Sequence, residues 1–340
     1  MNVKSSEIIK AKIQGQSDLR RLYGHIQRRL EEVESTLKRL TRSPNPLISE
    51  ISSYLFQKSG KRIRPALVLL CSGMSGGQAK DAVLSAALVE LLHTASLLHD
   101  DIIDNSDTRR GKTTVHVKWG PNVTVLLGDF LYIKTLALSL RSERRRLTDI
   151  LTESSTRMIE GELKEYNQSG NLRMTERDYL DIIDLKTASL FSASCRIGGM
   201  LGGATAAQEE ALAEYGTCLG LSFQVIDDLL DYTGDEKTLG KPVLADLAEG
   251  RVTLPLINAL HQNGRGDRSR ISRLLPRLKS HPRSRKEILE LIQAGSSLEY
   301  AFRRAEEFSR RAKEALDGFP PGIHRQSLSL LAEFVLNRNR

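Results

Sequence analysis

Residues 83–104 read VLSAALVELLHTASLLHDDIID. Apolar residues such as Val83, Leu91 and Leu98 recur at helical intervals, so they form one stripe along a helix. The pattern predicts a single long helix from Lys80 to Asp104, and its last turns carry three aspartates. A helix this apolar is buried among other helices, so the stretch indicates the fold class.

Helical spacing also dominates the rest of the chain, and no alternating strand pattern persists. Residues 1–42 are charged and have helical spacing. Further helices are predicted over 46–57, 66–71, 121–141, 143–167, 175–201, 207–232, 252–261, 285–293, 297–316 and 322–337. Thr175, with Asp178 three residues later, is a helix-start signal. No Pro/Gly-rich linker divides the chain. We therefore predict one all-α domain over residues 1–340, with residues 1–42 as a helical extension packed on it.

The composition is that of a soluble globular protein, with 40% hydrophobic and 27% charged residues. Cys71, Cys195 and Cys218 are far apart and form no CxxC pair. They argue against a zinc site or a disulfide framework and fit a reducing compartment. The first ten residues lack a signal-peptide core, and no stretch reaches the ~18 apolar residues of a spanning helix. We therefore expect a cytoplasmic protein.

Two aspartate clusters share one spacing. The first reads DDIID over residues 100–104 and the second DDLLD over residues 227–231. Residues i and i+4 lie on the same face of a helix, so the outer aspartates of each cluster point the same way. Carboxylates this close repel by about 4 kcal/mol per pair at an effective dielectric of 20, and the negative end of the helix dipole adds to the cost. A hard cation would neutralise them, and an all-carboxylate set favours Mg²⁺.

A solvated acidic helix end would explain one such cluster, but two copies inside apolar helices disfavour that interpretation. An EF-hand is excluded because its D-x-D-x-D-G loop is missing. Basic residues flank both clusters. Arg109 and Arg110 follow the first cluster in a polar loop, and each guanidinium can hold two diphosphate oxygens. Lys186 lies in an apolar helical stretch, where it needs a counter-charge. The combination predicts binding of metal-bridged polyanions.

These residues resemble the motifs of the trans-isoprenyl diphosphate synthases, the polyprenyl synthetase family. D-D-x-x-D with its arginine pair stands at residues 100–110, Q-x-x-D-D at 224–228, G-K-x-x-R-P at 60–65 and K-T at 186–187. The resemblance covers nearly the whole chain, most strongly from Gly60 to about Leu256, and is closest to long-chain members such as octaprenyl, heptaprenyl and solanesyl diphosphate synthases. It implies an all-α bundle around a deep central cavity, usually in a homodimer.

The resemblance also implies roles for the matching residues. Mg²⁺ would be bound by Asp100, Asp104 and Asp227, with support from Asp101, Asp228 and Asp231. The allylic diphosphate would be held by Arg109, Lys186, Thr187, Gln224, Asp227 and Lys241. Isopentenyl diphosphate would be held by Gly60, Lys61, Arg64, His93 and Arg110. Arg251 stands where many members carry lysine and keeps the positive charge for substrate binding. The catalytic set would be Asp100, Asp101, Asp104, Arg109, Lys186, Asp227, Asp228 and Lys241. Members of the family use about three Mg²⁺ ions per site, and Mn²⁺ can substitute.

The implied reaction is the head-to-tail (1′-4) condensation of isopentenyl diphosphate with an allylic diphosphate. In the family, the residues four and five before the first aspartate set the depth of the cavity. Here they are Ser96 and Ala95, both small. They predict an open tunnel and a product of about C30 to C50, the length of quinone side chains. A block deeper in the tunnel, at Leu88, Leu92, Leu136 or Leu140, would shorten the product.

Several other functions are open at the level of sequence. The nearest are a short-chain farnesyl or geranylgeranyl diphosphate synthase and the catalytic subunit of a heteromeric synthase. A regulatory subunit typically loses an aspartate or the arginine pair, and this chain has both. A terpene cyclase normally replaces the second cluster with an Asn/Ser/Glu site and has no use for Lys61 and Arg64. Squalene- and phytoene-type synthases have different acidic motifs.

The basic residues are concentrated in one segment. Residues 265–286 contain nine Lys or Arg and one Asp, which equals the whole net charge of +8. Turn residues around it predict a short basic helix framed by loops. The segment contains no aromatic residue, which argues against single-stranded nucleic acid, and we predict no nucleic-acid partner. The remaining interpretations are a solvated surface, an acidic partner and a peripheral membrane contact, the last for product release.

Overall fold

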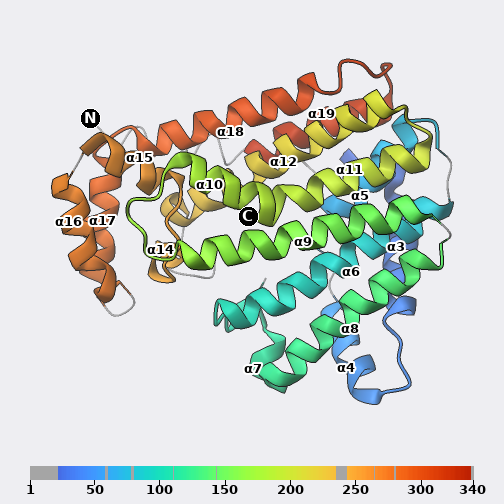
Figure 1. Cartoon of the computed structure of the whole chain (residues 1–340), viewed down its shortest axis with the longest axis horizontal. Helices are drawn as coiled ribbons and strands as arrows, with labels where there is room; N and C mark the ends of the chain where they lie inside the picture. Colours follow the sequence, from blue (N-terminus) through green and yellow to red (C-terminus); the bar gives the residue numbers. More distant parts are fainter. Residues whose placement is uncertain are drawn as a thin grey trace.

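The computed structural model describes residues 22–57, 60–77, 80–109, 111–142, 144–234, 243–263, 265–278 and 281–337. These residues form a bundle of α-helices, as predicted, and their one sheet is a two-residue antiparallel pair (Figure 1). In that pair Thr108 is opposite Thr113, and Arg109 is opposite Lys112. The predicted N-terminal extension falls partly on residues 1–21, which lie outside the described part.

The helices occur in the following order along the chain. They are α3 (Gln27–Leu40), α4 (Pro46–Leu55), α5 (Ile63–Met74), α6 (Lys80–Ile103), α7 (Val115–Trp119), α8 (Pro121–Leu140), α9 (Arg145–Asn167), α10 (Glu176–Ile183), α11 (Ser189–Gly202), α12 (Ala206–Thr233), α14 (Ala245–Ala248), α15 (Leu254–Asn263), α16 (Arg265–Leu274), α17 (Pro282–Gln293), α18 (Ser297–Glu314) and α19 (Ile323–Leu336). Short turns precede α3 (η1, Gly24–Ile26) and follow α16 (η3, Leu275–Arg277), and the strands are β1 (Thr108–Arg109) and β2 (Lys112–Thr113).

Local signals start several of these helices. Thr175 and Asp178 form a reciprocal capping box at α10, as the sequence predicts, and Thr205 does the same with Gln208 at α12. Glycines let neighbouring helices approach closely. A Cβ atom on Gly198 would lie 2.6 Å from a backbone oxygen of α5, so α11 and α5 could not pack as they do with a larger residue there.

The buried apolar residues form two clusters, and the aspartates lie where the clusters meet. The first cluster includes Leu98 of α6, and the second includes Val225 and Leu229 of α12. Helix α6 packs on α3, α5 and α8, whereas α12 packs on α11 and α18. Helix α12 also contributes Leu212 and Leu219 to the first cluster, so it joins the two.

The helix predicted over 175–201 is in fact interrupted, which corrects the sequence prediction. A π-helical turn, η2 (Asp184–Ala188), separates α10 from α11 and contains Lys186 and Thr187. Single π-turns inside α-helices often occur at functional sites, because the extra residue redirects side chains. This turn packs against α9.

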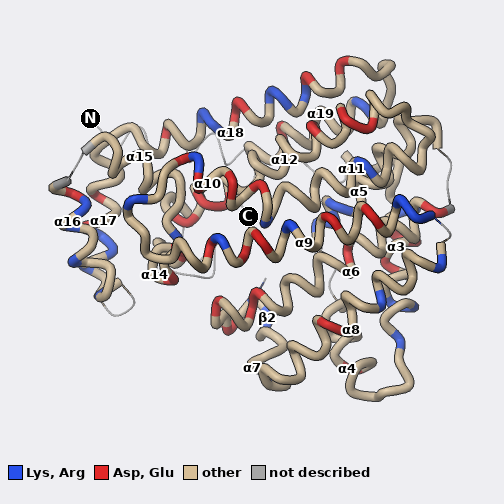
Figure 2. The backbone as a smooth tube through the Cα atoms, viewed as in Figure 1, with Lys and Arg blue, Asp and Glu red and all other residues tan. Residues whose placement is uncertain are grey.

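The basic segment forms the predicted short helix, α16, and the predicted helix over 285–293, α17, begins three residues earlier, so it includes the last basic residues of the segment. Helices α16 and α17 lie at one end of the molecule, at the left in Figure 1, and Lys and Arg gather on them in Figure 2. Arg270 pairs with Glu287, while the exposed Arg273, Arg277 and Arg283 have no carboxylate partner among the described residues. This end of the molecule is therefore strongly basic.

Two helices are more apolar than the sequence analysis suggested. By length and composition alone, residues 81–103 and Pro121–Leu140 could span a membrane. Both are helices of the bundle, and most of the first is buried inside it. Helix α8 instead exposes Leu126, Ile133 and Leu140, which are spaced seven residues apart and form one stripe.

Candidate active site

Two adjoining cavities meet between the aspartate clusters. The smaller, of about 400 Å³, is mainly polar, and the larger, of about 1010 Å³, is mainly apolar. Residues of both clusters and several cations line the two together. The shared residues are Asp100, Arg109, Lys186, Thr187, Gln224 and Asp227. A ligand with a polyanionic head and an apolar tail would fit across this junction.

The first cluster divides its three aspartates between two tasks. Asp100 and Asp104 line the smaller cavity, as their spacing predicts. Asp101 is buried and accepts a hydrogen bond from Nε of Arg109 at 2.5 Å. Burial raises the pKa of Asp100 to about 7, and Lys186 opposes that rise. Asp101 therefore orients Arg109, while Asp100 and Asp104 face the cavity.

The second cluster is divided in a similar way. Asp227 and Asp228 line the smaller cavity. Asp228 is buried and accepts hydrogen bonds from the hydroxyl of Tyr179 at 2.6 Å and from the amide of Gln224 at 2.8 Å. Burial raises the pKa of Asp228 well above its ordinary value. Gln224 also accepts a hydrogen bond from Thr187 at 2.8 Å, so the α12 motif is tied to the K-T motif.

Asp231 has a different environment from the other two. Its side chain is almost completely buried and does not line either cavity. Its carboxylate accepts hydrogen bonds from the backbone N–H groups of Ala245 and Asp246, each at 3.2 Å, at the start of α14. Asp231 therefore fixes the segment that follows α12, and its predicted supporting role toward a metal stays a prediction.

The counter-charge that Lys186 requires comes from α9. Its ammonium lies 2.7 Å from Glu162 and 2.5 Å from Glu165. Burial alone would lower the pKa of Lys186, but Glu165, Glu162 and Asp100 outweigh burial and raise it. Neither the two glutamates nor Tyr179 was predicted from the sequence. The glutamates are three residues apart on one helix, a spacing that also fits a solvated face, so the spacing alone could not identify them.

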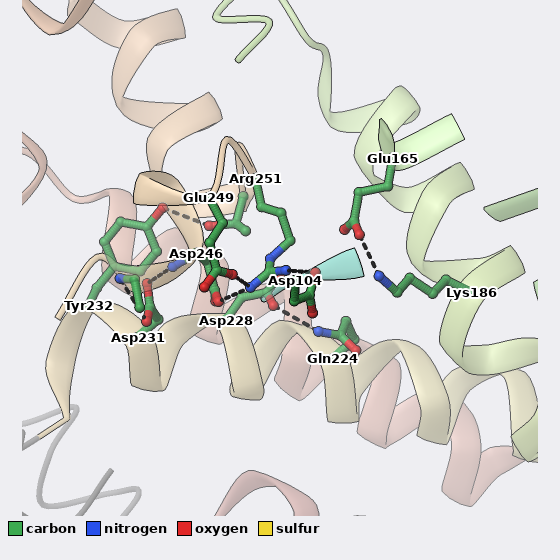
Figure 3. A network of polar contacts seen from close by, with 12 residues as sticks. Asp104, Glu165, Lys186, Gln224, Asp228, Asp231, Tyr232, Asp246, Glu249 and Arg251 are labelled. Atoms are coloured by element: carbon green, nitrogen blue, oxygen red, sulfur yellow. Dashed lines mark hydrogen bonds and ion pairs between the residues drawn. The ribbon is translucent and has the colours of Figure 1, made fainter. Parts of the chain in front are cut away.

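Arg251 connects the two halves of the site (Figure 3). Its Nη1 lies 2.7 Å from Oδ1 of Asp104, and its Nη2 lies 2.8 Å from Oδ1 of Asp246. Nη2 also pairs with Glu249. These carboxylates raise the pKa of Arg251 above its ordinary value, although burial alone would lower it. Arg251, predicted to bind substrate through its positive charge, thus lies at the polar cavity, where three carboxylates surround it.

The motif at residues 60–65 lies at the larger cavity. Gly60, Lys61, Arg64 and His93 all line it, as predicted. Arg64 Nη1 lies 3.1 Å from Nε2 of His93, which joins α5 to α6. Arg62 has a left-handed backbone conformation and binds Glu34 at 2.5 Å and Glu90. Arg62 therefore anchors the loop, and its neighbours face the cavity.

Other predicted residues lie partly or wholly outside this arrangement. Arg110 and Lys241 are outside the described residues. Ser96 lines the larger cavity, whereas Ala95 is fully buried in the core and is not part of the cavity wall. The wall also includes apolar or aromatic side chains from four helices, which are Leu97, Ile103, Tyr132, Met158, Leu163 and Phe223.

The donor set fits Mg²⁺ bound with a diphosphate. Among the described residues, no three Asp, Glu, His or Cys side chains form a ready-made metal site. Asp100, Asp104 and Asp227 instead surround the polar cavity as separate oxygen donors. Mg²⁺ is commonly held by one or two carboxylates, with phosphate oxygens and water completing its shell. The arrangement suits a cation whose coordination shell is completed by oxygens of a diphosphate.

An all-α bundle with two aspartate clusters and several cations around a polar cavity, beside an apolar one, defines an enzyme of diphosphate substrates with apolar tails. The sequence model of the polyprenyl synthetase family matches residues 45–292. The chain is 34% identical to the octaprenyl diphosphate synthase of Haemophilus influenzae over 310 residues, which cover 91% of this chain and 94% of that protein.

Two further comparisons agree. The chain is 36% identical to a short chain isoprenyl diphosphate synthase of Methanothermobacter thermautotrophicus over 312 residues, or 91% of this chain and 94% of that one. The crystal structure of a polyprenyl synthase from Caulobacter crescentus, complexed with calcium and isoprenyl diphosphate, superposes with a TM-score of 0.90 at 33% identity and covers 96% of this chain and 99% of that one. The chain belongs to the polyprenyl synthetase family. The predictions of an all-α isoprenoid synthase fold and of a prenyltransferase are confirmed.

Proposed function

We propose that the chain condenses isopentenyl diphosphate with an allylic diphosphate in a Mg²⁺-dependent reaction and repeats the step to give a long all-trans product. The observation that carries the proposal is the junction of the two cavities. Both aspartate clusters, Lys186 and Arg109 surround its polar side, and an apolar volume of about 1010 Å³ begins beside it. The relatives reported above act on the same class of substrate, and they support the assignment.

Each side of the site has its own task in this reaction. Asp100, Asp104 and Asp227 would hold the Mg²⁺ ions, which supply positive charge to the diphosphate as its C–O bond breaks. Lys186, Arg109 and Arg251, with the predicted Lys241, hold the oxygens of the allylic diphosphate. Lys61, Arg64 and His93, with the predicted Arg110, orient isopentenyl diphosphate at the wall of the larger cavity.

The bonds change as follows. The allylic C–O bond breaks, and its electron pair leaves with the diphosphate. The double bond of isopentenyl diphosphate attacks the allylic cation and forms the new C–C bond. A proton then leaves the adduct and a new double bond remains; by family resemblance, the released diphosphate takes that proton. The apolar wall excludes water, which would otherwise trap the cation.

We infer a product of about C30 to C50 because the apolar cavity is at the upper end of the size range of ligand pockets. Ser96 keeps the wall open at the level of the first aspartate helix. A short-chain synthase is the second candidate, because the relative from Methanothermobacter thermautotrophicus has that activity in its name. Tyr132, which projects from α8 into the wall, could limit the product in that case.

We also propose a homodimer. The exposed apolar stripe of α8 contains Leu126, Ile133 and Leu140, which are 67%, 68% and 67% exposed. Exposed apolar patches of this kind mark protein–protein contacts. Light scattering after size exclusion should give twice the chain mass for the wild type and the monomer mass for an Ile133→Glu variant.

The experiment that tests the reaction is incorporation of labelled isopentenyl diphosphate into a butanol-extractable product. Mg²⁺ and geranyl or farnesyl diphosphate should both be required, and EDTA should abolish incorporation. Asp100→Asn should reduce kcat by about 100-fold or more. The matched control Asp149→Asn changes an exposed aspartate that lines neither cavity and should leave kcat unchanged. Incorporation that persists in EDTA would contradict the proposal.

A further inference from the structure

Arg251 makes a contact that its predicted role in substrate binding does not require. It lies after α14, yet it binds Asp104 at the end of α6, 147 residues away in sequence, with 2.7 Å between Nη1 and Oδ1. The other arm of the guanidinium binds Asp246 and Glu249 of its own segment (Figure 3). The contact joins the two halves of the site through a predicted metal ligand.

The environment makes this contact strong. The side chains of Arg251 and Asp104 are 21% and 19% exposed. Coulomb interactions gain strength as charges leave water, and a guanidinium held by several carboxylates has little freedom left to lose. Asp246 has its backbone N–H fixed by Asp231, so the segment that presents Arg251 is itself anchored to α12.

Asp104 cannot serve two cations fully at once. The oxygen that accepts the hydrogen bond from Arg251 is one of the two that a divalent ion would bind, and a second positive charge beside it repels the ion. A diphosphate changes the balance, because its oxygens offer the guanidinium charge-assisted hydrogen bonds of at least equal strength.

We propose that Arg251 is a positioning residue that competes with the divalent cation for Asp104, and that a bound diphosphate relieves this competition by engaging the guanidinium. The inference rests on the proposed function, in which Asp104 binds metal and Arg251 faces a diphosphate. Because binding free energies are coupled reciprocally, metal and diphosphate then strengthen each other's binding through this one side chain. Premature loading of the first aspartate cluster is thereby disfavoured.

The test measures Mn²⁺ binding without turnover, by the loss of the free-ion electron paramagnetic resonance signal. Arg251→Gln should bind Mn²⁺ about five- to tenfold more tightly than the wild type when no diphosphate is present. Inorganic diphosphate should tighten Mn²⁺ binding strongly in the wild type and much less in the variant. Arg251→Lys keeps the charge but loses the two-armed grip, so it should bind Mn²⁺ with intermediate affinity. It replaces Arg251→Gln in the comparison if that variant does not fold.

The matched control is Arg304→Gln. Arg304 also bridges carboxylates, at 2.8 Å from Glu176 and beside Glu307, but it lies away from both cavities. This variant should lose thermal stability and keep the wild-type affinity for Mn²⁺. If Arg251 were only structural, Arg251→Gln would also lose thermal stability and keep the wild-type affinity for Mn²⁺. That result would overturn the inference, and so would weaker Mn²⁺ binding by Arg251→Gln.

The outcomes separate the inference from the proposed function. If the wild type condenses its substrates but Arg251→Gln binds Mn²⁺ no more tightly than the wild type, the proposed competition for Asp104 is wrong. The proposed condensation reaction is then unaffected. If Mn²⁺ binding tightens as expected but no condensation occurs with any primer, the competition stands and the proposed reaction is wrong.

Discussion

Asp227 and Asp231 lie one helical turn apart on α12, but their surroundings differ. Asp227 lines both cavities, whereas Asp231 is 1% exposed and accepts two backbone N–H groups at the start of α14. The carboxylate of Asp231 thus holds the segment that presents Arg251, and Asp227 faces the cavities in which we propose that the substrates bind. We therefore expect Asp227 to act in the reaction and Asp231 to fix the backbone around it.

Substitution by asparagine should separate these two roles. Asp227→Asn should lower kcat by about 100-fold or more, with a normal melting temperature, because a cavity-lining charge is lost. Asp231→Asn should keep kcat within about tenfold of the wild type and lower the free energy of unfolding by about 1–2 kcal/mol. Steady-state kinetics, thermal unfolding and hydrogen exchange at Ala245 and Asp246 measure these effects. A loss of kcat in Asp231→Asn as large as that in Asp227→Asn would contradict the division of roles.

Sequence patterns located the charged residues of the site better than their partners. The spacing of Asp100 and Asp104, and the need of Lys186 for a counter-charge, both predicted what the structure has. The ion pair between Asp101 and Arg109 could not be predicted from the sequence, because it depends on the conformation of the loop after α6. Tyr179 was missed because a single tyrosine in an amphipathic helix resembles any core residue.

At the scale of elements, the π-turn η2 depends on α9. A Cβ atom on Gly161 of α9 would lie 2.5 Å from the backbone nitrogen of Lys186, so only glycine permits the contact. The backbone at Lys186 can therefore approach α9 closely enough for its ammonium to reach Glu162 and Glu165. The position of the Lys186 ammonium is therefore set by packing between two helices.

Gly161→Ala should move that turn and misplace the ammonium of Lys186. We expect kcat/KM for the allylic substrate to fall by about 10- to 100-fold, because small displacements of a positioned charge are costly. Gly318→Ala is the control, since a Cβ atom there meets no atom within 4 Å. Steady-state kinetics with varied allylic diphosphate provides the measurement. Equal kinetics for the two variants would contradict the packing argument.

Helix bounds were predictable from the sequence to within a few residues, but their internal irregularities were not. Helices α6, α8 and α12 match their predicted ranges because each has a long apolar stripe and clear ends. The π-turn escaped prediction because the stretch 175–201 keeps helical spacing across it. The π-turn is stabilised by contact with α9. A contact between distant segments cannot be predicted from the residue spacing within one of them.

At the scale of the whole molecule, a histidine pair joins the two ends of the described chain. His25 of η1 lies 3.1 Å from His324 of α19, nitrogen to nitrogen, and His324 packs against Gly73 of α5. Burial lowers the pKa of both histidines below the ordinary 6.5; the neighbouring His324 adds to this for His25, and Arg29 does so for His324. The unfolded chain therefore binds protons more readily than the folded one below that pH.

The contribution of this pair to the free energy of unfolding should be fully present above about pH 6.5. It should decrease as the pH falls toward the lowered pKa values that the two histidines have in the folded state. We expect the melting temperature of the wild type to fall by a few degrees more between pH 7.5 and 5.5 than that of His25→Gln. The comparison cancels other titrating groups such as Asp100. His261→Gln, at an exposed position, should follow the wild type. Parallel pH profiles for the wild type and His25→Gln would contradict the prediction.

The basic end formed by α16 and α17 should affect membrane contact and leave the fold unchanged. Each arginine near an anionic surface contributes about 1 kcal/mol, so replacing three should weaken binding to phosphatidylglycerol vesicles by about 100-fold. The replacements are Arg270→Gln, Arg273→Gln and Arg277→Gln, and the matched control changes three exposed arginines of α18, Arg303, Arg310 and Arg311. Vesicle co-sedimentation at several salt concentrations measures the effect. Equal binding by both triple variants, or none by the wild type, would favour a solvated surface.

The size of the product made from farnesyl diphosphate tests the proposed reaction and the open cavity together. Purified protein would be incubated with Mg²⁺, farnesyl diphosphate and labelled isopentenyl diphosphate, and the extracted chains would be separated by reversed-phase chromatography. We expect a ladder of products that ends between about C30 and C50, because the apolar cavity beside Asp100 and Ser96 is open. No condensation with farnesyl, geranyl or dimethylallyl diphosphate would contradict the central claim that this site joins prenyl diphosphates.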